Sequence, residues 1–362
     1  MSVLSKKTKL RPESAPEIRL HDAATLSGQL PRLEAYLLGQ GPASLTRHPA
    51  WLTILRRGLG HVPYLLEASE EGRTCGVLPL ALVRGPLFGR FLVGLPYVNS
   101  GGVTADNDRA AYELVERAAG LADDLRVRFL ELRHEQPLDH PRLTGRMTSK
   151  VHMRLPLPAT ADALWRGLNG KARNQVRKAR KQGVTVAWGG LDLLDAFYAV
   201  FSRNMRDLGT PVYGRGLFRA VLEEFPGRAD LCVARLGPRP VAAALLLHGN
   251  GVSDVPSASS LRPYNHTCAN TLLYWHLLER SVERGQQVFD FGRCTRGGSL
   301  FAFKAGWGAQ PEPAVWQYYV RSGTVGDMRP DNPRYGRLIR LWQRLPVALT
   351  RLLGPAIVRG IP

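Results

Sequence analysis

The feature that most constrains the fold is an order of elements that occurs twice along the 362 residues. In each half, three short apolar segments of strand type are followed by a polar turn, an amphipathic helix and a further strand. In the first half these are residues 64–68, 76–83, 91–95, the helix 109–123 and the strand 127–132. In the second half they are residues 231–236, 240–247, 252–257, the helix 269–284 and the strand 287–291. A repeat of this kind predicts two tandem α+β domains with mixed sheets flanked by helices.

The repeat also sets the expected domain boundaries. A join is predicted near residue 150, ahead of Pro156 and Pro158. The expected segments are a disordered basic tail over 1–15, a first domain over 16–150, a second, catalytic domain over 151–325 and a basic amphipathic segment over 326–362. We expect the last segment to pack back on the body, its arginines in water and four apolar side chains inward. These four are Leu338, Leu341, Trp342 and Leu345. The alternative is that the segment lies on anionic lipid.

Basic residues outnumber acidic ones by 19. A surplus of this size favours a polyanionic partner, such as nucleic acid, a nucleotide-linked sugar or an anionic membrane surface. Biased codon composition is the alternative, because the chain has 41 arginines against 8 lysines.

Several classes of protein are excluded by the motifs that the sequence lacks. No apolar run reaches the roughly 20 residues of a membrane-spanning helix, and no secretory signal follows the basic start. The four cysteines lack metal-ligand spacing and the nine histidines show no HExxH motif, so no metal site is expected. We expect a cytoplasmic monomer whose contact with the inner face of the membrane, if any, is peripheral.

A basic helix is predicted over 162–182, with apolar residues every three or four positions and Gly183 as its stop. Between Lys171 and Lys181 the sequence has six basic residues and no acidic one. We expect this stripe to bind substrate phosphate, and a solvated helix face is the alternative. The residues that would make the contacts are Lys171, Arg173, Arg177, Lys178 and Lys181.

The densest chemical signal is the sequence FDFGR at 289–293, followed by FAFKAGWG at 301–308. Gly292 allows a sharp change of direction at the end of a strand. Lys304 lies between Phe303 and the turn that contains Trp307. An ammonium among aromatic rings is partly desolvated, so it acts strongly on a developing oxyanion or a phosphate. The alternative is a lysine whose stem covers aromatic surface while its head reaches water.

Other polar residues are weaker candidates. Asp290 is either a base toward an acceptor amine or a structural partner of Arg293. Tyr97 and Asn99 end a strand of the first half, where contacts with an acceptor are expected and a simple turn is the alternative. Cys294 is better explained as a buried inert thiol than as an acyl-carrying nucleophile.

Residues 171–183, 289–293 and 301–308 resemble the FemAB-like branch of the GNAT acyltransferases. They look most like the FemAB-related proteins associated with the PEP-CTERM/exosortase exopolysaccharide system, and the endings WQRLP at 342–346 and LGP at 353–355 are similar too. The resemblance covers roughly residues 30–360. It implies two GNAT-like domains and transfer of an aminoacyl or acyl group to an amine of a cell-envelope glycan or exopolysaccharide precursor.

The resemblance also implies roles for individual residues. Lys304 matches the family's lysine near the reacting carbonyl or the donor phosphate, and Phe303 matches its aromatic neighbour. Ser260 and Arg262 fall where the family has polar and basic residues that line the site. We also place Arg293 and Trp307 among the substrate contacts. No bound cofactor is implied: the acyl donor, aminoacyl-tRNA or acyl-CoA, is a co-substrate, and the partner is a nucleotide- or lipid-linked glycan precursor.

Two departures from the family bear on the donor. The glycine-rich pyrophosphate loop of GNAT proteins is absent and RPYNH at 262–266 stands in its place, which counts against standard acetyl-CoA binding. The long heptad hairpin that contacts tRNA in some members is absent too. Two alternatives therefore stay open: an acyl-CoA-dependent sugar N-acetyltransferase, and a non-catalytic basic protein that binds nucleic acid or membrane.

Overall fold

The computed structural model describes residues 15–324 and 335–362. The predicted basic tail, apart from Ala15, lies outside these residues, as does the start of the predicted C-terminal segment. Within the described ranges, none of the helices has the length and apolar character that a membrane-spanning helix needs.

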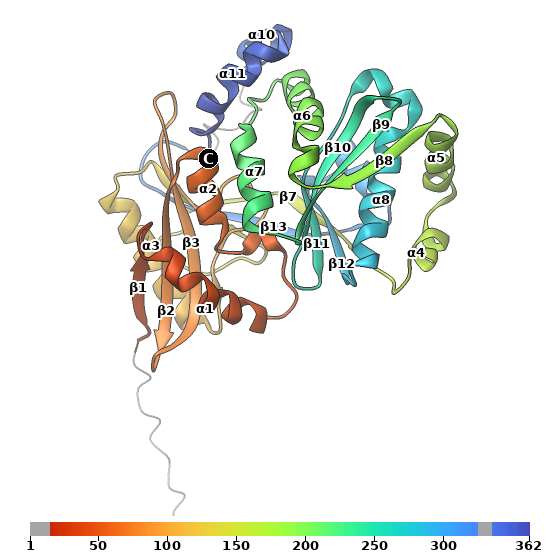
Figure 1. The fold of residues 1–362 in the computed structure, drawn as a ribbon. Coiled ribbons are helices and arrows are strands. Elements are labelled where there is room, and N and C mark those ends of the chain that lie inside the picture. The colour runs from red at the N-terminus through yellow and green to blue at the C-terminus, as the bar shows by residue number, and fades with distance from the viewer. Residues whose placement is uncertain (1–14, 325–334) are drawn as a thin grey trace, which may run out of the picture.

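The described strands form one sheet of 13 strands that crosses the whole molecule (Figure 1). Its strands are β1 (Glu17–His21), β2 (Val62–Glu70), β3 (Arg73–Gly85), β4 (Gly89–Val93), β5 (Thr104–Ala105), β6 (Phe129–His134), β7 (Gly145–Pro156), β8 (Val184–Gly189), β9 (Ala229–Leu236), β10 (Arg239–His248), β11 (Val252–Ser260), β12 (Val288–Thr295) and β13 (Gln310–Val320). The α-helices are α1 (Leu26–Gly39), α2 (Trp51–Leu59), α3 (Asp108–Asp124), α4 (Ala161–Gly167), α5 (Gly170–Lys181), α6 (Leu194–Leu208), α7 (Arg215–Glu224), α8 (Ala269–Glu283), α9 (Ser299–Ala305), α10 (Gly336–Arg344) and α11 (Val347–Val358). Short 3-10 helices are η1 (Leu45–Arg47), η2 (Leu191–Leu193) and η3 (Arg262–Thr267).

The order of the strands shows that the two halves are built alike. From one edge the order is β1-β2-β3-β4-β6-β13-β7-β12-β11-β10-β9-β8, and β5 pairs with β3. In each half the outer strands are antiparallel, and one parallel pair follows, β4 with β6 and β11 with β12. A long helix, α3 or α8, connects the two strands of each parallel pair. The predicted fold class of tandem domains with helices around mixed sheet is confirmed.

The halves exchange strands at the centre of the sheet. β7 follows β6 in the chain but pairs with β12 of the second half. β13, the last strand, pairs with β6 of the first half and with β7. The predicted join near residue 150 therefore falls inside β7. The two halves share one sheet and have no linker between two separate sheets at that place.

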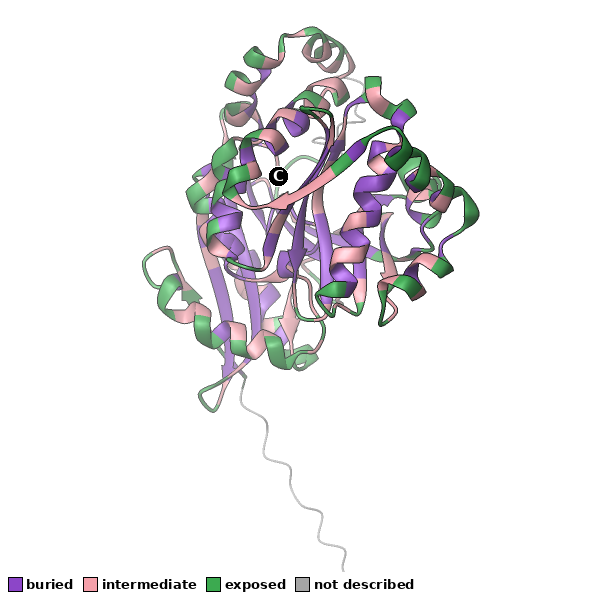
Figure 2. Cartoon of the chain, turned by 45° about the vertical axis from the view of Figure 1, so that its right-hand side comes forward, coloured by how far each residue is buried: buried purple, intermediate pink, exposed green. Residues whose placement is uncertain are grey.

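Helices cover both faces of this sheet, so that the central strands are almost wholly buried (Figure 2). α1, α2, α6 and α7 bury one face of both halves in a single apolar core. On the opposite face α3 covers the first half, and α4, α5 and α8 cover the second. Side chains alternate across a strand, so neighbours such as Leu65 and Leu66 enter different cores.

The predicted basic helix over 162–182 is two helices, α4 and α5. Leu168 has extended backbone with ψ 145°, and Asn169 then accepts a hydrogen bond from the Ala172 N–H at 2.8 Å. Asparagine is among the best N-cap residues, so a new helix begins at Gly170. The predicted apolar face is confirmed, because its members are all buried. They are Leu164, Leu168, Ala172, Val176 and Ala179.

The C-terminal segment forms α10 and α11, which lie against α6 (Figure 1). Trp342 and Leu345 are half-buried, but Leu338 and Leu341 are 62% and 59% exposed. The prediction that all four side chains pack inward is therefore wrong for these two leucines. The physical reason is that α10 approaches α6 through Ile339 and Gln343, on a different side of the helix.

Candidate functional site

The two parallel strands of the second half separate after three paired residues. β11 and β12 pair only through Val252–Asp254 and Val288–Asp290, although both strands continue. At the separation each strand carries a β-bulge: residues 255–256 of β11 oppose one residue of β10, and residues 291–292 of β12 oppose one residue of β7. Bulges bend strands, free backbone groups from the ladder and are common beside active sites. We call the unpaired ends of the two strands, residues 255–260 and 291–295, the strand fork.

Polar side chains hold the bulge of β12 in place. Gly292 has φ +76°, and a Cβ there would lie 2.9 Å from the Asn99 side-chain nitrogen, so both conformation and space require glycine. The Gly292 N–H donates to Asp290 Oδ1 at 2.7 Å. The Lys304 ammonium on α9 donates to the carbonyl oxygens of Gly292 at 2.8 Å and Arg293 at 3.2 Å. These bonds satisfy backbone groups that the bulge removes from the ladder.

Lys304 and Asp290 both make hydrogen bonds that hold the bulge. Lys304 is 5% exposed, burial lowers the pKa of its ammonium, and its head neither reaches water nor is left open for a substrate. Asp290 has both oxygens occupied, since Arg154 Nε donates to Oδ2 at 3.1 Å. This argues against Asp290 as a base. In the structure both side chains act as positioning residues that shape the fork, and their direct catalytic roles stay predictions.

Asp254 and Asp290 face each other in the last pair of β11 and β12, and their pKa values are shifted in opposite directions. Burial raises the pKa of Asp254 to about 8, and Ser44 Oγ donates to its Oδ2. Burial acts on Asp290 too, but His152, Arg154 and the Gly292 N–H outweigh it and hold the pKa of Asp290 below its ordinary value. At neutral pH the pair therefore carries one proton and one negative charge.

A groove of about 180 Å³ lies beside the fork, between α5, α8 and α9. Phe303 and Trp307 form its aromatic wall and pack against Tyr274. Lys171 lines it from the first turn of α5. Because α5 and α8 both begin here, the positive ends of their dipoles add to the lysine charge. We call this site the α5–α8 groove.

The α5–α8 groove brings together three residues predicted from sequence, Lys171, Phe303 and Trp307. It also contains residues that the sequence reasoning missed. They are Asn169, Gln175 and Thr271. The available signal was the asparagine directly before Gly170, which is typical of a helix start.

The remaining predicted phosphate contacts do not line this groove. Arg173 is half-buried and Lys178 is exposed on α5, and the Arg177 guanidinium lies 5.6 Å from the centre of the Trp165 ring. Arg262 is exposed at the start of η3, and Ser260 ends β11 in register with Ala242. These residues stay predictions as substrate contacts.

Tyr97 and Asn99 lie at the seam between the two halves. Asn99 reaches Gly292 of the fork, as described above. Tyr97 has φ +70°, stacks on His61 and shares a hydrogen bond of 2.9 Å with its Nε2. A positive φ at a non-glycine residue is costly, and such strain gathers at functional sites. The structure therefore brings the predicted acceptor residues of the first half to the fork of the second.

Arg293 places a positive charge at the same seam between the two halves. Its guanidinium carbon lies 3.7 Å from the centre of the Trp316 ring, and that of Arg133 lies 4.2 Å from the same ring. Arg133 pairs with Glu131 at 2.7 Å, whereas no described carboxylate pairs with Arg293 and its Nη1 is buried without a hydrogen bond among the described residues. Burial and the nearby Arg133 lower the pKa of Arg293 to about 9. A guanidinium in this state would gain strongly from an anionic ligand.

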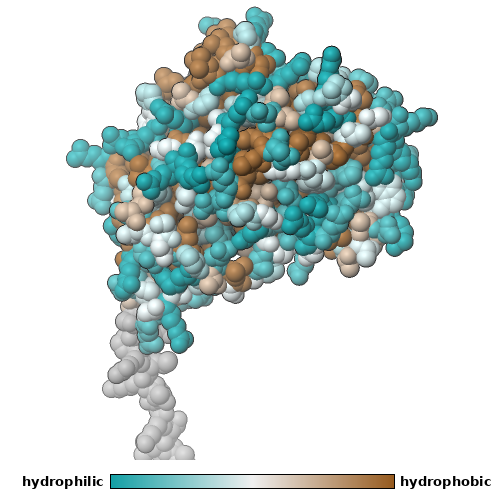
Figure 3. Space-filling model, in the orientation of Figure 1, coloured by the Kyte–Doolittle hydropathy of each residue, from teal (hydrophilic) through white to brown (hydrophobic). Residues whose placement is uncertain are grey.

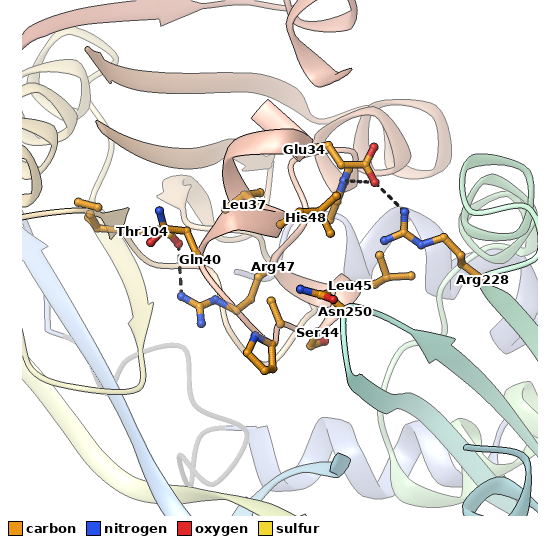
Figure 4. A pocket seen from close by; sticks show the side chains of 15 residues that line it. Glu34, Leu37, Gln40, Ser44, Leu45, Arg47, His48, Thr104, Arg228 and Asn250 are labelled. Carbon is orange, nitrogen blue, oxygen red and sulfur yellow. Dashed lines mark hydrogen bonds and ion pairs between the residues drawn. The ribbon is translucent and has the colours of Figure 1, made fainter. Parts of the chain in front are cut away.

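A second cavity, of about 270 Å³, lies between α1, η1 and the start of β11 (Figure 4). Glu34 accepts from Arg228 at 2.6 Å and lies 3.4 Å from His48, and Arg47 Nη2 donates to Thr104 at 3.3 Å. The cavity adjoins Asn250, before the first residue of β11, whereas the fork is at the last residues of that strand. No fork residue lines this cavity, although Ser44, which does, donates to Asp254 directly before the fork; the sequence analysis assigned the lining residues no role.

Comparison with known proteins agrees with this geometry. Residues 169–305 match the family model described as acetyltransferase (GNAT) domain. The matched stretch begins at the N-cap of α5 and ends with α9, so it contains the fork and the lining of the α5–α8 groove except Gly306 and Trp307. No curated protein matches the chain.

Solved structures resemble the chain in fold. FemX has a TM-score of 0.60 and 14% identity, over 80% of this chain and 95% of its own. A tandem GNAT protein from the clavulanic acid biosynthesis pathway has a TM-score of 0.54 and 15% identity, over 85% and 100%. The C-terminal domain of a putative lysylphosphatidylglycerol synthetase from Agrobacterium fabrum has a TM-score of 0.53 and 13% identity, over 82% and 93%. The chain thus has a tandem GNAT-like fold, and the match to the GNAT family model lies in its second half.

Removing the Lys304 ammonium tests its positioning role. Lys304→Met leaves two buried carbonyl groups without their charged donor, so the free energy of unfolding should fall by about 2–4 kcal/mol. Lys181→Met, at an exposed lysine of α5, is the control and should change it by less than about 0.5 kcal/mol. Denaturant titration measures both. Equal stability of the two variants would contradict the positioning role.

Asp254 should make stability fall as pH rises. The folded chain holds a proton up to about pH 8, whereas the unfolded chain releases it near pH 4, so the stabilisation is complete below pH 4 and is lost on rising to pH 8. The slope amounts to at most about 1.4 kcal/mol per pH unit. Asp254→Asn, which cannot titrate, should show a flatter profile in denaturant titrations at pH 5 to 8. Parallel profiles for the variant and the wild type would be the opposite result.

Proposed function

We propose that the protein is an N-acyltransferase that transfers an aminoacyl or acyl group to an amine of a cell-envelope glycan or exopolysaccharide precursor. The observation that carries the reaction class is the strand fork. β11 and β12 separate at two adjacent bulges, beside a groove with positive charge and an aromatic wall. An extended acyl chain fits between the separated strand ends, because main-chain groups of β11 that face the fork can replace the missing ladder bonds.

The chemistry follows from this placement. The donor's carbonyl would lie in the fork, where a free backbone N–H stabilises the oxyanion that forms. The amine nitrogen attacks the carbonyl carbon, the bond from that carbon to the donor's sulfur or oxygen breaks, and the proton that the nitrogen loses neutralises the departing thiolate or alkoxide. Lys304 and Asp290 serve this step by holding Gly292 and thereby the width of the fork.

The donor's phosphate is best accommodated at the first turn of α5. The glycine-rich loop typical of GNAT proteins is missing before α8, where Cys268 has φ +59° and Thr267 Oγ1 accepts the Ala269 N–H at 3.3 Å. Lys171 and the N–H groups of α5 offer an anion site in its place. Both donor candidates, acyl-CoA and aminoacyl-tRNA, carry phosphate, and the tandem GNAT protein cited above favours testing coenzyme A first.

The acceptor would arrive from the seam, where Tyr97 and Asn99 of the first half meet the fork. Arg293 adds an uncompensated cation there, which suits an acceptor with a phosphate or carboxylate group. A nucleotide- or lipid-linked glycan precursor has this property. The likeness to FemX in fold and the FemAB-like motifs support a glycan-linked amine; the likeness to a lysylphosphatidylglycerol synthetase domain makes a lipid-linked acceptor worth including.

The experiment is a screen of donors against amine acceptors, read by mass spectrometry, followed by one charge reversal. Lys171→Glu places a negative charge in the α5–α8 groove and should weaken donor binding at least about tenfold. The matched control is Arg180→Glu, an equal charge change on the same helix nine residues on. At 100° per residue this lies on the opposite side of α5. Calorimetry with coenzyme A and with an aminoacylated RNA hairpin measures the affinities.

Equal affinities of the two variants would show that the groove does not hold the donor. A screen in which no acyl group is transferred to any amine, with the wild-type chain folded, would count against the proposed reaction itself.

A further inference from the structure

α10 and α11 are consecutive helices, and polar contacts attach both to α6. Arg206 Nη1 donates to the Leu345 carbonyl at 2.8 Å, and Gln343 Nε2 donates to the Asp207 carbonyl at 3.2 Å. Arg351 Nε donates to Ser202 Oγ at 2.8 Å. These contacts hold the two helices without using most of their leucines.

The two helices also approach the body where glycine leaves no side chain between them. A Cβ on Gly354 would lie 2.8 Å from the Val212 nitrogen, and one on Gly209 would lie 2.5 Å from Ile339. Such close approach fixes which face of each helix points inward. Because these close approaches fix the inward side of each helix, the side that carries the leucines faces outward.

The outward face is apolar. Leu338, Leu341 and Leu352 are 62%, 59% and 75% exposed, and Leu349 and Leu353 are exposed beside them. Figure 3 shows the resulting hydrophobic surface over α10 and α11 at the top of the molecule. The tip of the β3–β4 hairpin extends it, because a Cβ on Gly360 would lie 3.3 Å from the Phe88 ring and the adjacent Leu87 is 73% exposed. Exposed apolar patches of this kind mark docking surfaces.

The same segment is strongly basic. Residues 335–362 contain five arginines and neither aspartate nor glutamate. Arg351 points inward to Ser202, whereas the other four are exposed. These four are Arg337, Arg340, Arg344 and Arg359. Exposed leucines flanked by arginines, with no acidic residue, are the pattern of a helix that lies in the interface of an anionic bilayer.

We infer that α10, α11 and the β3–β4 tip form a docking surface for a bilayer that contains anionic phospholipid. The leucines enter the boundary between headgroups and acyl chains, and the arginines pair with lipid phosphates. A second copy of the chain fits less well, because a symmetric contact would bring the exposed arginines of both copies together without a carboxylate on either helix. The inference is independent of the proposed acyl transfer.

Vesicle flotation tests it with the full chain. Vesicles of phosphatidylcholine alone should bind little, and vesicles that also contain phosphatidylglycerol should bind the protein, less so as salt is raised. A triple variant with Leu338→Gln, Leu341→Gln and Leu352→Gln should bind the anionic vesicles at least about tenfold less. A second triple variant with Arg337→Gln, Arg340→Gln and Arg344→Gln should lose the preference for phosphatidylglycerol.

The control replaces exposed leucines elsewhere, Leu38 on α1 and Leu191 on η2, by glutamine and should bind like wild type. Thermal unfolding should stay unchanged in all variants, because the replaced side chains are exposed. No binding to anionic vesicles, or equal binding by the leucine triple variant, would overturn the inference. So would an ultracentrifugation result in which wild type is a dimer and the leucine triple variant a monomer, since the patch would then join two copies.

Discussion

The site depends on one local constraint, the bulge of β12 at Gly292. Left to itself, β12 would continue alongside β11, and no space would exist between them. The Asp290 carboxylate accepts a hydrogen bond from the Gly292 N–H, and the Lys304 ammonium donates to two carbonyl oxygens. The backbone groups that the bulge exposes are therefore satisfied without a strand partner. A buried lysine and a buried aspartate are costly, and here each is balanced by hydrogen bonds that keep the strand fork open.

The exchange of β7 and β13 explains how residues of both halves meet at this fork. Each half borrows its central strand from the other, so the first half cannot move away without breaking the sheet. Gln317 of β13 shows the coupling: its amide bonds His134 and Leu138 of the first half at 2.7–3.0 Å. Asn99 is thereby held against Gly292 and Tyr97 near Pro256 and Ser257 of the fork, so the seam becomes part of the site.

The sequence predicted the elements whose pattern is local. The repeated strands, α3, α8 and the buried side of α5 were predicted correctly, because the spacing of apolar residues along the sequence indicates which side of an element is buried. β7 and β13 were missed as central strands, since their pairing is with distant segments and their sequences are mixed. The sequence correctly indicated that the Lys304 ammonium lies among aromatic side chains. It does not reveal whether that ammonium faces a substrate or, as in the structure, donates to two backbone carbonyls. The exposed Leu338 and Leu341 were placed inward because an amphipathic pattern does not reveal which surface its apolar side meets.

The central claim is that the donor binds in the α5–α8 groove and reaches the strand fork. Hydrogen exchange with and without donor measures this directly, using coenzyme A and an aminoacylated RNA hairpin as probes. The account predicts slower exchange of amides in the first turn of α5, the first turn of α8 and residues 291–295 with one of these probes. Protection confined to the separate cavity around Arg47 and Asn250, or no protection by either probe at saturating concentration, would contradict it.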